Sequence, residues 1–129
     1  FNKDQGIRRF KYCIGLLNER GLEINHPLVP VDIKSEGELG ADNSFITLTS
    51  DSMTLEAVKK CEEEEAYIIR MVEKKGRSVD ASVKFFAPLT YAAECDLIER
   101  NDVPVDFDGD TISFHATPFE IKNFKVKIK

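Results

Sequence analysis

The side chains that could bind a metal ion or act as a nucleophile are few and far apart in this sequence. Zinc sites are built from His, Cys or carboxylate ligands, usually with one closely spaced pair. The two histidines, His26 and His115, have no ligand at such spacing, and the three cysteines, Cys13, Cys61 and Cys95, contain no Cys-x-x-Cys pair. A catalytic Cys with a His partner has no local signature either. We therefore expect no metal site and no catalytic residue in this chain.

Carboxylates could serve glycoside hydrolysis, which in its retaining form needs two carboxyl groups about 5 Å apart. Glu94 and Asp96 alternate on one face of a predicted strand, roughly 6.6 Å apart by strand rise. An exposed polar strand face produces this spacing routinely, so we interpret the pair as solvated. The run Glu62-Glu63-Glu64-Glu65 is interpreted as a solvated turn. Residues 106–110 (DFDGD) lack the downstream Glu of an EF-hand and predict a hairpin turn.

A cation and an aromatic ring stand out from their surroundings. Arg70 shares a face with Ile68 and Val72 in an otherwise apolar strand, so we expect a carboxylate partner and a structural ion pair. Sugar-binding surfaces commonly use aromatic rings, but the chain has no Trp. The alternation places its tyrosines, Tyr12, Tyr67 and Tyr91, on inward positions. Phe86, out of phase with Phe85, points outwards, and we expect it to pack against a neighbouring domain; substrate-binding residues stay unknown.

The elements that position these side chains are predicted from alternating apolar and polar residues, which are typical of half-buried strands. The 129 residues fit one domain, 1–129. Short strands with turn signals such as Asp108-Gly109 favour an all-β fold, an antiparallel β-sandwich of immunoglobulin-like or related type, with at most one short helix. In the closing segment the apolar residues change phase, which predicts a bulge or bend near Lys122-Asn123. The predicted strands cover residues 8–17, 44–49, 79–85, 91–97, 111–116 and 119–128.

The segment from Asp51 to Gly76 admits two interpretations. Ser52 could cap a helix whose apolar residues recur at i and i+3, and the many Glu and Lys residues favour helix. A hairpin with strands 55–61 and 66–73 is the alternative, because four consecutive glutamates repel one another on a helix and Tyr67-Ile68-Ile69 favours a strand. The residues alone leave this choice open.

Composition excludes some classes of function. The net charge of −5 argues against nucleic-acid binding, and no apolar run approaches the roughly 20 residues that cross a membrane. The odd number of cysteines and the absence of an Asn-x-Ser/Thr site favour a reducing, cytoplasmic location. The start at Phe1, without an initiator Met, leads us to expect a fragment of a longer protein.

Several short blocks resemble, in order, segments of glycoside hydrolase family 38, the α-mannosidases. The tail from Pro118 to Val126 (PFEIKNFKV) is similar to the closing PFEI-K-T strand of that family. The other blocks resemble its F-N-x-P-L, L-K-K-A-E, L-R-L-Y-E…G-R and D-L-L-E segments; they are 24–28 (INHPL), 58–62 (VKKCE), 69–73 (IRMVE) with Gly76-Arg77, and 96–99 (DLIE). The sequence departs from the family at Asn123 (usually Thr), Cys61 (usually Ala) and Lys74-Lys75 (usually Pro-Thr).

The resemblance implies an all-β C-terminal part of a multidomain enzyme, and it favours the hairpin at 51–76. In that family the catalytic Asp and the zinc ligands belong to a separate N-terminal barrel. We therefore expect a non-catalytic domain of a retaining α-mannosidase, with the catalytic domain of the same polypeptide as its partner, an α-mannoside as the parent's substrate and zinc only in the parent. The alternative is an independent carbohydrate- or protein-binding sandwich.

Overall fold

Strands follow one another without a helix through residues 43–129 of the computed structural model, which describes residues 7, 9, 12, 28–32 and 43–129. The chain divides into two units, Phe1–Glu38 and Leu39–Lys129, and the second contains all of these strands. They are β1 (Ile46–Leu48), β2 (Met53–Lys60), β3 (Tyr67–Glu73), β4 (Val79–Phe85), β5 (Leu89–Glu94), β6 (Val103–Pro104), β7 (Phe107–Asp108), β8 (Thr111–Ala116) and β9 (Ile121–Ile128).

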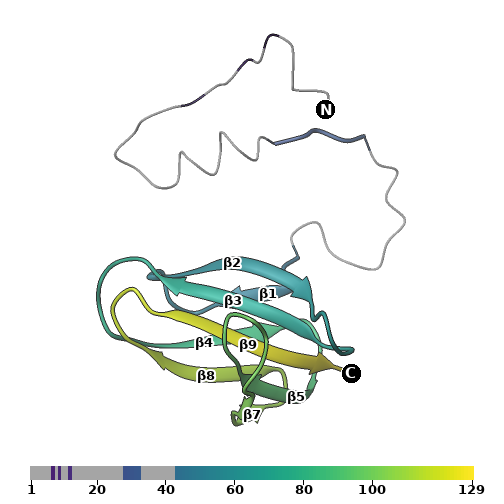
Figure 1. The fold of residues 1–129 in the computed structure, drawn as a ribbon, viewed down its shortest axis with the longest axis vertical. Helices are drawn as coiled ribbons and strands as arrows, with labels where there is room; N and C mark the ends of the chain where they lie inside the picture. The colour runs from purple at the N-terminus through teal and green to yellow at the C-terminus, as the bar shows by residue number, and fades with distance from the viewer. Residues whose placement is uncertain (1–6, 8, 10–11, 13–27, 33–42) are drawn as a thin grey trace, which may run out of the picture. The chain divides into compact units, whose positions relative to one another are not determined.

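The strands form two sheets that make up a sandwich (Figure 1). The four-stranded sheet has the order β1-β4-β8-β7, and the five-stranded sheet has the order β2-β3-β9-β5-β6. Every pairing in both sheets is antiparallel. The prediction of an all-β antiparallel sandwich is confirmed, and the described residues contain none of the short helix that it allowed. A membrane-spanning helix is accordingly absent from the part of the chain that the structure describes.

Alternation places the core between the sheets, as the sequence predicted for β1, β4 and β8. Val83 and Phe85 of β4 and Ile112 of β8 are fully or almost fully buried, while Phe114 of β8 packs on Phe124 of β9 with ring centroids 5.3 Å apart. These rings join one sheet to the other. The remaining buried members of the core are Met53, Ile69, Met71, Ala81, Leu89, Ala92, Ala116 and Val126.

The segment from Asp51 to Gly76 is a hairpin, so the helical interpretation is wrong. Strand β2 pairs with β3 from Met53↔Glu73 to Lys60↔Tyr67, and the acidic run forms the turn. The β-branched residues of β3 are buried on both faces of the sheet. The helix-forming residues around this strand hide that burial from a reading of the sequence alone. The predicted hairpin at Asp108-Gly109 is also confirmed, with Phe107↔Ile112 and Asp108↔Thr111 as partners.

The bulge predicted near Lys122-Asn123 is wrong. Strand β9 pairs with β3 in one continuous register from Ile121 to Val126. The apolar residues change phase because Ile121 is 45% exposed on the outer face, while Lys122 occupies an inward position at the end of the sandwich. The register shifts instead in β2, between Leu55 and Ala57, and in β5, between Leu89 and Tyr91.

The inward placement of the tyrosines is wrong for Tyr91, because the register of β5 shifts. The shift in β5 puts both Leu89 and Ala92 in the core and turns Tyr91 to the outer face of the five-stranded sheet, where it is half-buried. Tyr67 does share the inner face of β3 with Ile69, but it lies at one end of the strand and is 47% exposed. Tyr12 is exposed, and the predicted strand around it, 8–17, lies largely outside the described residues.

Candidate functional site

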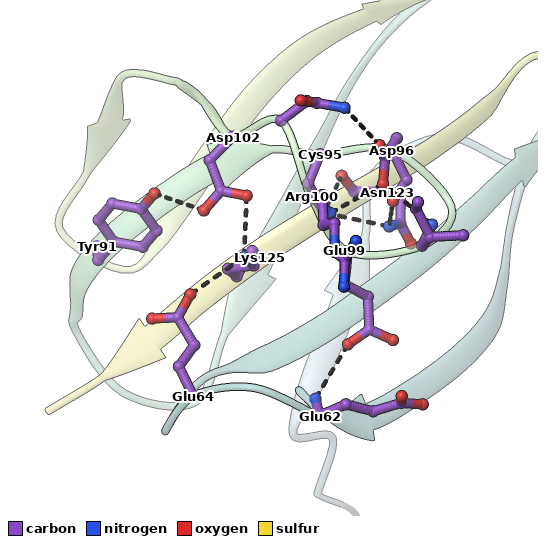
Figure 2. Close-up of polar contacts among 12 residues, drawn as sticks. Glu62, Glu64, Tyr91, Cys95, Asp96, Glu99, Arg100, Asp102, Asn123 and Lys125 are labelled. Atoms are coloured by element: carbon purple, nitrogen blue, oxygen red, sulfur yellow. Dashed lines mark hydrogen bonds and ion pairs between the residues drawn. The ribbon is translucent and has the colours of Figure 1, made fainter.

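A loop covers part of the outer face of the five-stranded sheet, and the densest group of polar contacts in the described chain lies around it. We call residues 95–102, which connect β5 to β6, the covering loop. A second, small cluster of buried residues lies on this outer face, outside the main core: Cys61, Ala66, Ile68 and Cys95. Figure 2 shows the loop with its polar side chains turned towards β9 and the turn that precedes β3.

Lys125 of β9 is the cation at the centre of these contacts, and it is 5% exposed. Its Nζ lies 2.9 Å from Asp102 Oδ1 and 3.1 Å from Glu64 Oε1 (Figure 2). Tyr91 donates its hydroxyl hydrogen to Asp102 Oδ2 at 3.0 Å, and Lys127 Nζ lies 2.7 Å from Glu64 Oε2. Burial lowers the pKa of Lys125, but the two carboxylates outweigh burial and raise this pKa above its ordinary value. The lysine therefore stays charged and holds the end of the loop to the sheet.

Asn123 of β9 fixes the beginning of the covering loop. Its side chain is buried and donates to the backbone oxygen of Asp96 at 2.7 Å and to Cys95 Sγ at 3.2 Å. Its Oδ1 accepts a hydrogen bond from Arg70 Nε at 3.2 Å, and Arg70 also donates to the backbone oxygen of Leu97 at 3.1 Å. The predicted carboxylate partner of Arg70 is wrong within the described chain: its acceptors there are neutral oxygens, which the loop and Asn123 supply.

Asp96 and Glu99 shape the covering loop from within. The Asp96 carboxylate accepts hydrogen bonds from the backbone of Ile98 and Arg100 and from the Asn101 side chain, and these contacts, against the effect of burial, lower its pKa. Glu99 and Asn101 have φ of 67° and 58°, a left-handed conformation that is unfavourable for residues other than glycine. Glu99 is held there by the Lys59 ammonium at 2.5 Å and by the backbone N–H of Glu62 at 3.1 Å.

Each glutamate of the acidic turn, Glu62 to Glu65, forms an ion pair with a Lys or Arg side chain. Each of its four glutamates has a cation within 3.1 Å: Lys59 for Glu62, Arg100 for Glu63, Lys125 and Lys127 for Glu64, and Lys60 for Glu65. The prediction of a turn is confirmed. The solvated interpretation misses Glu64, which is only partly exposed and reaches across to β9.

A buried carboxylate joins two turns at the other end of β3. Glu73 is fully buried, and it accepts backbone hydrogen bonds from Lys75 and Gly76 at 2.8 Å, from Phe119 at 3.0 Å and from Arg77 at 3.3 Å. Burial raises the pKa of Glu73, but these hydrogen bonds outweigh burial and hold the pKa below its ordinary value. The Phe119 ring covers Gly76, so two of the segments that resemble family 38 meet at this carboxylate.

An apolar groove lies at the end of the sandwich where the chain enters β1. Phe45 and Phe86 meet edge to face, with centroids 5.2 Å apart and an interplanar angle of 88°. With Val58 and Tyr67 they border a hollow of about 420 Å³. We call this hollow the Phe45–Phe86 groove; its lining is completed by Ile46, Ile69, Phe85, Ile128 and Lys129. Phe86 is exposed, as predicted.

The other candidate residues take structural positions or lie outside the described chain. Glu94 Oε1 accepts from Lys122 Nζ at 3.0 Å, and Asp96 turns into the covering loop, so neither is simply solvated and they form no free carboxylate pair. His115 is exposed, with Nδ1 2.8 Å from Asp80 Oδ1. Cys61 and Cys95 are buried free thiols, as interpreted, and burial raises the pKa of Cys95. His26 and Cys13 lie outside the described residues.

Lys125, Asp102 and Glu73 are important residues that the sequence did not single out, and Asn123 was noted without any sign that it would hold a loop. Alternation did indicate that Asn123, Lys125 and Lys127 share the outer face of β9, but such a face is normally read as solvent-exposed. No local pattern shows that a loop will cover it. The residues that the structure describes include no group of three or more His, Cys, Asp and Glu able to hold a metal ion, so they do not fit zinc.

These features define the class of protein: an antiparallel β-sandwich in which polar contacts fix a loop and two turns to the five-stranded sheet. The family model for the glycosyl hydrolases family 38 C-terminal beta sandwich domain matches residues 52–124. The chain belongs to this family. A comparison with curated proteins finds no match. The matched residues run from β2 into β9 and include the covering loop and Glu73.

Proposed function

We propose that the chain is a non-catalytic C-terminal domain of an α-mannosidase that supports the enzyme's catalytic domain. The observation that carries the proposal is the family match over residues 52–124, in a sandwich where Asn123 and Glu73 hold a loop and two turns. Retaining hydrolysis of an α-mannoside would need two carboxyl groups facing the scissile bond. Glu94 and Asp96 are bound elsewhere, to Lys122 and to the covering loop.

The proposal extends to partners, cofactor and location. The catalytic domain of the same polypeptide is the partner, and the α-mannoside is bound by that domain. Zinc belongs there as well, as a Lewis acid for the substrate, and the described residues of this chain offer no cluster of ligands for it. We place the enzyme in the cytoplasm, on the argument from the odd cysteine number; the two described thiols are buried and free. No nucleic acid or membrane takes part.

The gene upstream of Phe1 tests this proposal. We expect it to encode a barrel with a Gly-x-His-x-Asp zinc signal, and we expect the intact protein to release p-nitrophenol from p-nitrophenyl α-mannoside. A reading frame without such a domain, or an intact protein that is inactive on α-mannosides while cleaving another glycoside, would overturn it. An α-mannosidase assay of the 129-residue chain alone cannot decide, because neither this function nor the binding module described next predicts activity for the isolated chain.

The second candidate function is an independent carbohydrate- or protein-binding module. The observation that favours it is the Phe45–Phe86 groove, because exposed rings are the side chains on which sugars stack. Chemical-shift titration of the isolated chain with methyl α-mannoside and with mannobiose distinguishes the two functions. Binding at millimolar concentration or tighter, with chemical-shift changes at Phe45 and Phe86, favours the binding module. An unperturbed spectrum favours the non-catalytic domain of an α-mannosidase.

A further inference from the structure

We propose that the Phe45–Phe86 groove is the surface on which the catalytic domain, which precedes the sandwich in the polypeptide, docks. The inference rests on the proposed function and assigns to it a contact surface. The occupant is an apolar segment on the surface of that domain.

The groove has the character of an uncovered interface. Phe45, Phe86, Val58 and Tyr67 are 60%, 62%, 51% and 47% exposed, and all four border the same hollow. Single exposed apolar side chains are ordinary on protein surfaces, whereas a contiguous group around a concave site marks a place of interaction. Aromatic residues are enriched at the centres of such interfaces.

The groove is also shaped in advance. The edge-to-face contact between Phe45 and Phe86 restricts both rings, and Ile69 and Phe85, which are almost fully buried, form its floor. Binding then costs little additional side-chain entropy, because the contact residues are already ordered. An apolar segment that enters the hollow replaces water on the exposed rings.

The position of the chain identifies the occupant. Asn43 and Ser44 line a second hollow that also contains Phe45 and Phe86, and β1 begins at Ile46. The polypeptide that precedes the sandwich therefore joins it at the rim of the groove, and a catalytic domain on the N-terminal side is tethered there through residues 1–42. The family match is to a C-terminal domain, so the other domains of such an enzyme precede it. A tether of this kind gives the preceding domain an effective concentration in the millimolar range, which favours it over a second copy of the chain.

The test is site-specific photo-cross-linking in the intact enzyme. We replace Phe86 with p-benzoyl-phenylalanine, irradiate, and map the cross-linked peptides by mass spectrometry. The matched control carries the same photoreactive residue at Phe119, an aromatic side chain that is 70% exposed near Glu73, at the opposite end of β3 from Tyr67. We expect position 86 to give an intramolecular cross-link to the catalytic domain and position 119 to give at least tenfold less of it.

Cross-links from position 86 that join two chains, that reach any peptide outside the catalytic domain, or that are no more frequent than those from position 119 would overturn the inference. A second measurement is independent of the probe. Phe86→Ser should lower the thermal unfolding temperature of the intact enzyme by more than that of the 129-residue chain, which loses only the contact with Phe45, and equal shifts in both would contradict docking. Neither readout uses α-mannosidase activity. If the intact protein has no α-mannosidase activity but its preceding domain docks on the groove, only the proposed function is overturned.

Discussion

Glu73 shows how much a single carboxylate can organise. It brings together the turn after β3 and the turn before β9, because it accepts backbone hydrogen bonds from both. A buried backbone N–H without a partner is unfavourable, so each of these donors fixes its segment in place. Gly76 and Phe119 take φ of 68° and 60° around it. The residue is thus a joint between elements.

Gly76→Ala should lower the free energy of unfolding by about 2–4 kcal/mol, as measured by urea denaturation of the 129-residue chain. A positive φ costs a non-glycine residue about 1–2 kcal/mol. The added Cβ would also stand 2.7 Å from the Phe119 ring, and overpacking adds about 1–3 kcal/mol.

Gly109→Ala is the matched control, since Gly109 has φ of 60° and no atom within 4 Å of an added Cβ. It should cost only the conformational part, about 1–2 kcal/mol. In a Phe119→Ala background the cost of Gly76→Ala should fall towards the Gly109 value. If the two glycine substitutions cost the same in the unaltered chain, the packing argument fails.

Lys125→Met should destabilise the isolated chain by about 3 kcal/mol, because it leaves the Asp102 and Glu64 carboxylates facing each other without their shared cation. The cost is read from chemical denaturation at neutral pH. Lys127→Met, which removes a cation 41% exposed in its side chain, should cost less than about 1 kcal/mol. A Lys125 variant as stable as the Lys127 variant would show that solvent already screens the pair.

The covering loop is the element that most depends on distant parts of the chain. Asn123, Lys125 and Lys59 all hold it, and they come from β9 and β2. Leu97 and Ile98 at its tip stay exposed, so little apolar burial holds the loop in place. Its order therefore rests on hydrogen bonds and ion pairs.

Asn123→Thr, which introduces the residue usual in the family, should loosen the beginning of the loop. Threonine is too short to donate to the backbone oxygen of Asp96 and also accept from Arg70. We expect amide hydrogen exchange of residues 96–102 to accelerate by roughly tenfold, corresponding to about 1.4 kcal/mol of local stability. Exchange in β4 serves as the internal reference and should not change; unchanged protection of residues 96–102 would show that Asn123 does not hold the loop.

The strands could be predicted from the sequence because alternation is a local signal. Residues 79–85 and 111–116 match β4 and β8, since Val83 and Ile112 lie on faces that the pattern alone defines. The shift at Leu89/Tyr91 could not be seen, because Ala92 and Ala93 are equally small and apolar and both are buried, on opposite faces. The site was missed for another reason: Lys125 and Asp102 meet through folding, and neither stands out locally.

Acid should destabilise the whole molecule, because it protonates carboxylates that accept hydrogen bonds or form ion pairs in the folded state. The backbone N–H of Thr117, with Lys122, lowers the pKa of Glu120 to about 2 from an ordinary 4.5, and the pKa of Glu73 is lowered as well. A folded-state pKa below the unfolded one gives stability that is complete above pH 4.5 and is lost as the pH falls through the folded pKa. The unfolding temperature should therefore hold above pH 5 and fall steadily between about pH 4.5 and 2.

Circular dichroism melts of the isolated chain from pH 7 to pH 2 measure this dependence. Glu73→Gln should lower the unfolding temperature at pH 7 and flatten its decline on the acid side, because one of the responsible carboxylates is gone. Asp80→Asn, whose ion-pair partner among the described residues is the exposed His115, is the control and should not flatten the decline as Glu73→Gln does. A steeper decline in the Glu73 variant would contradict the assignment.

The register shift between Leu55 and Ala57 has a consequence for the behaviour of the sandwich in concentrated solution. Unpaired backbone groups along a sheet edge are a template for strands of other molecules. Of the four edge strands among the described residues, β1, β6 and β7 have three residues or fewer, and only β2 offers a long edge. The irregularity there twists the backbone, and Glu56, Lys59 and Lys60 add charge beside it. These features oppose edge-to-edge aggregation of the sandwich.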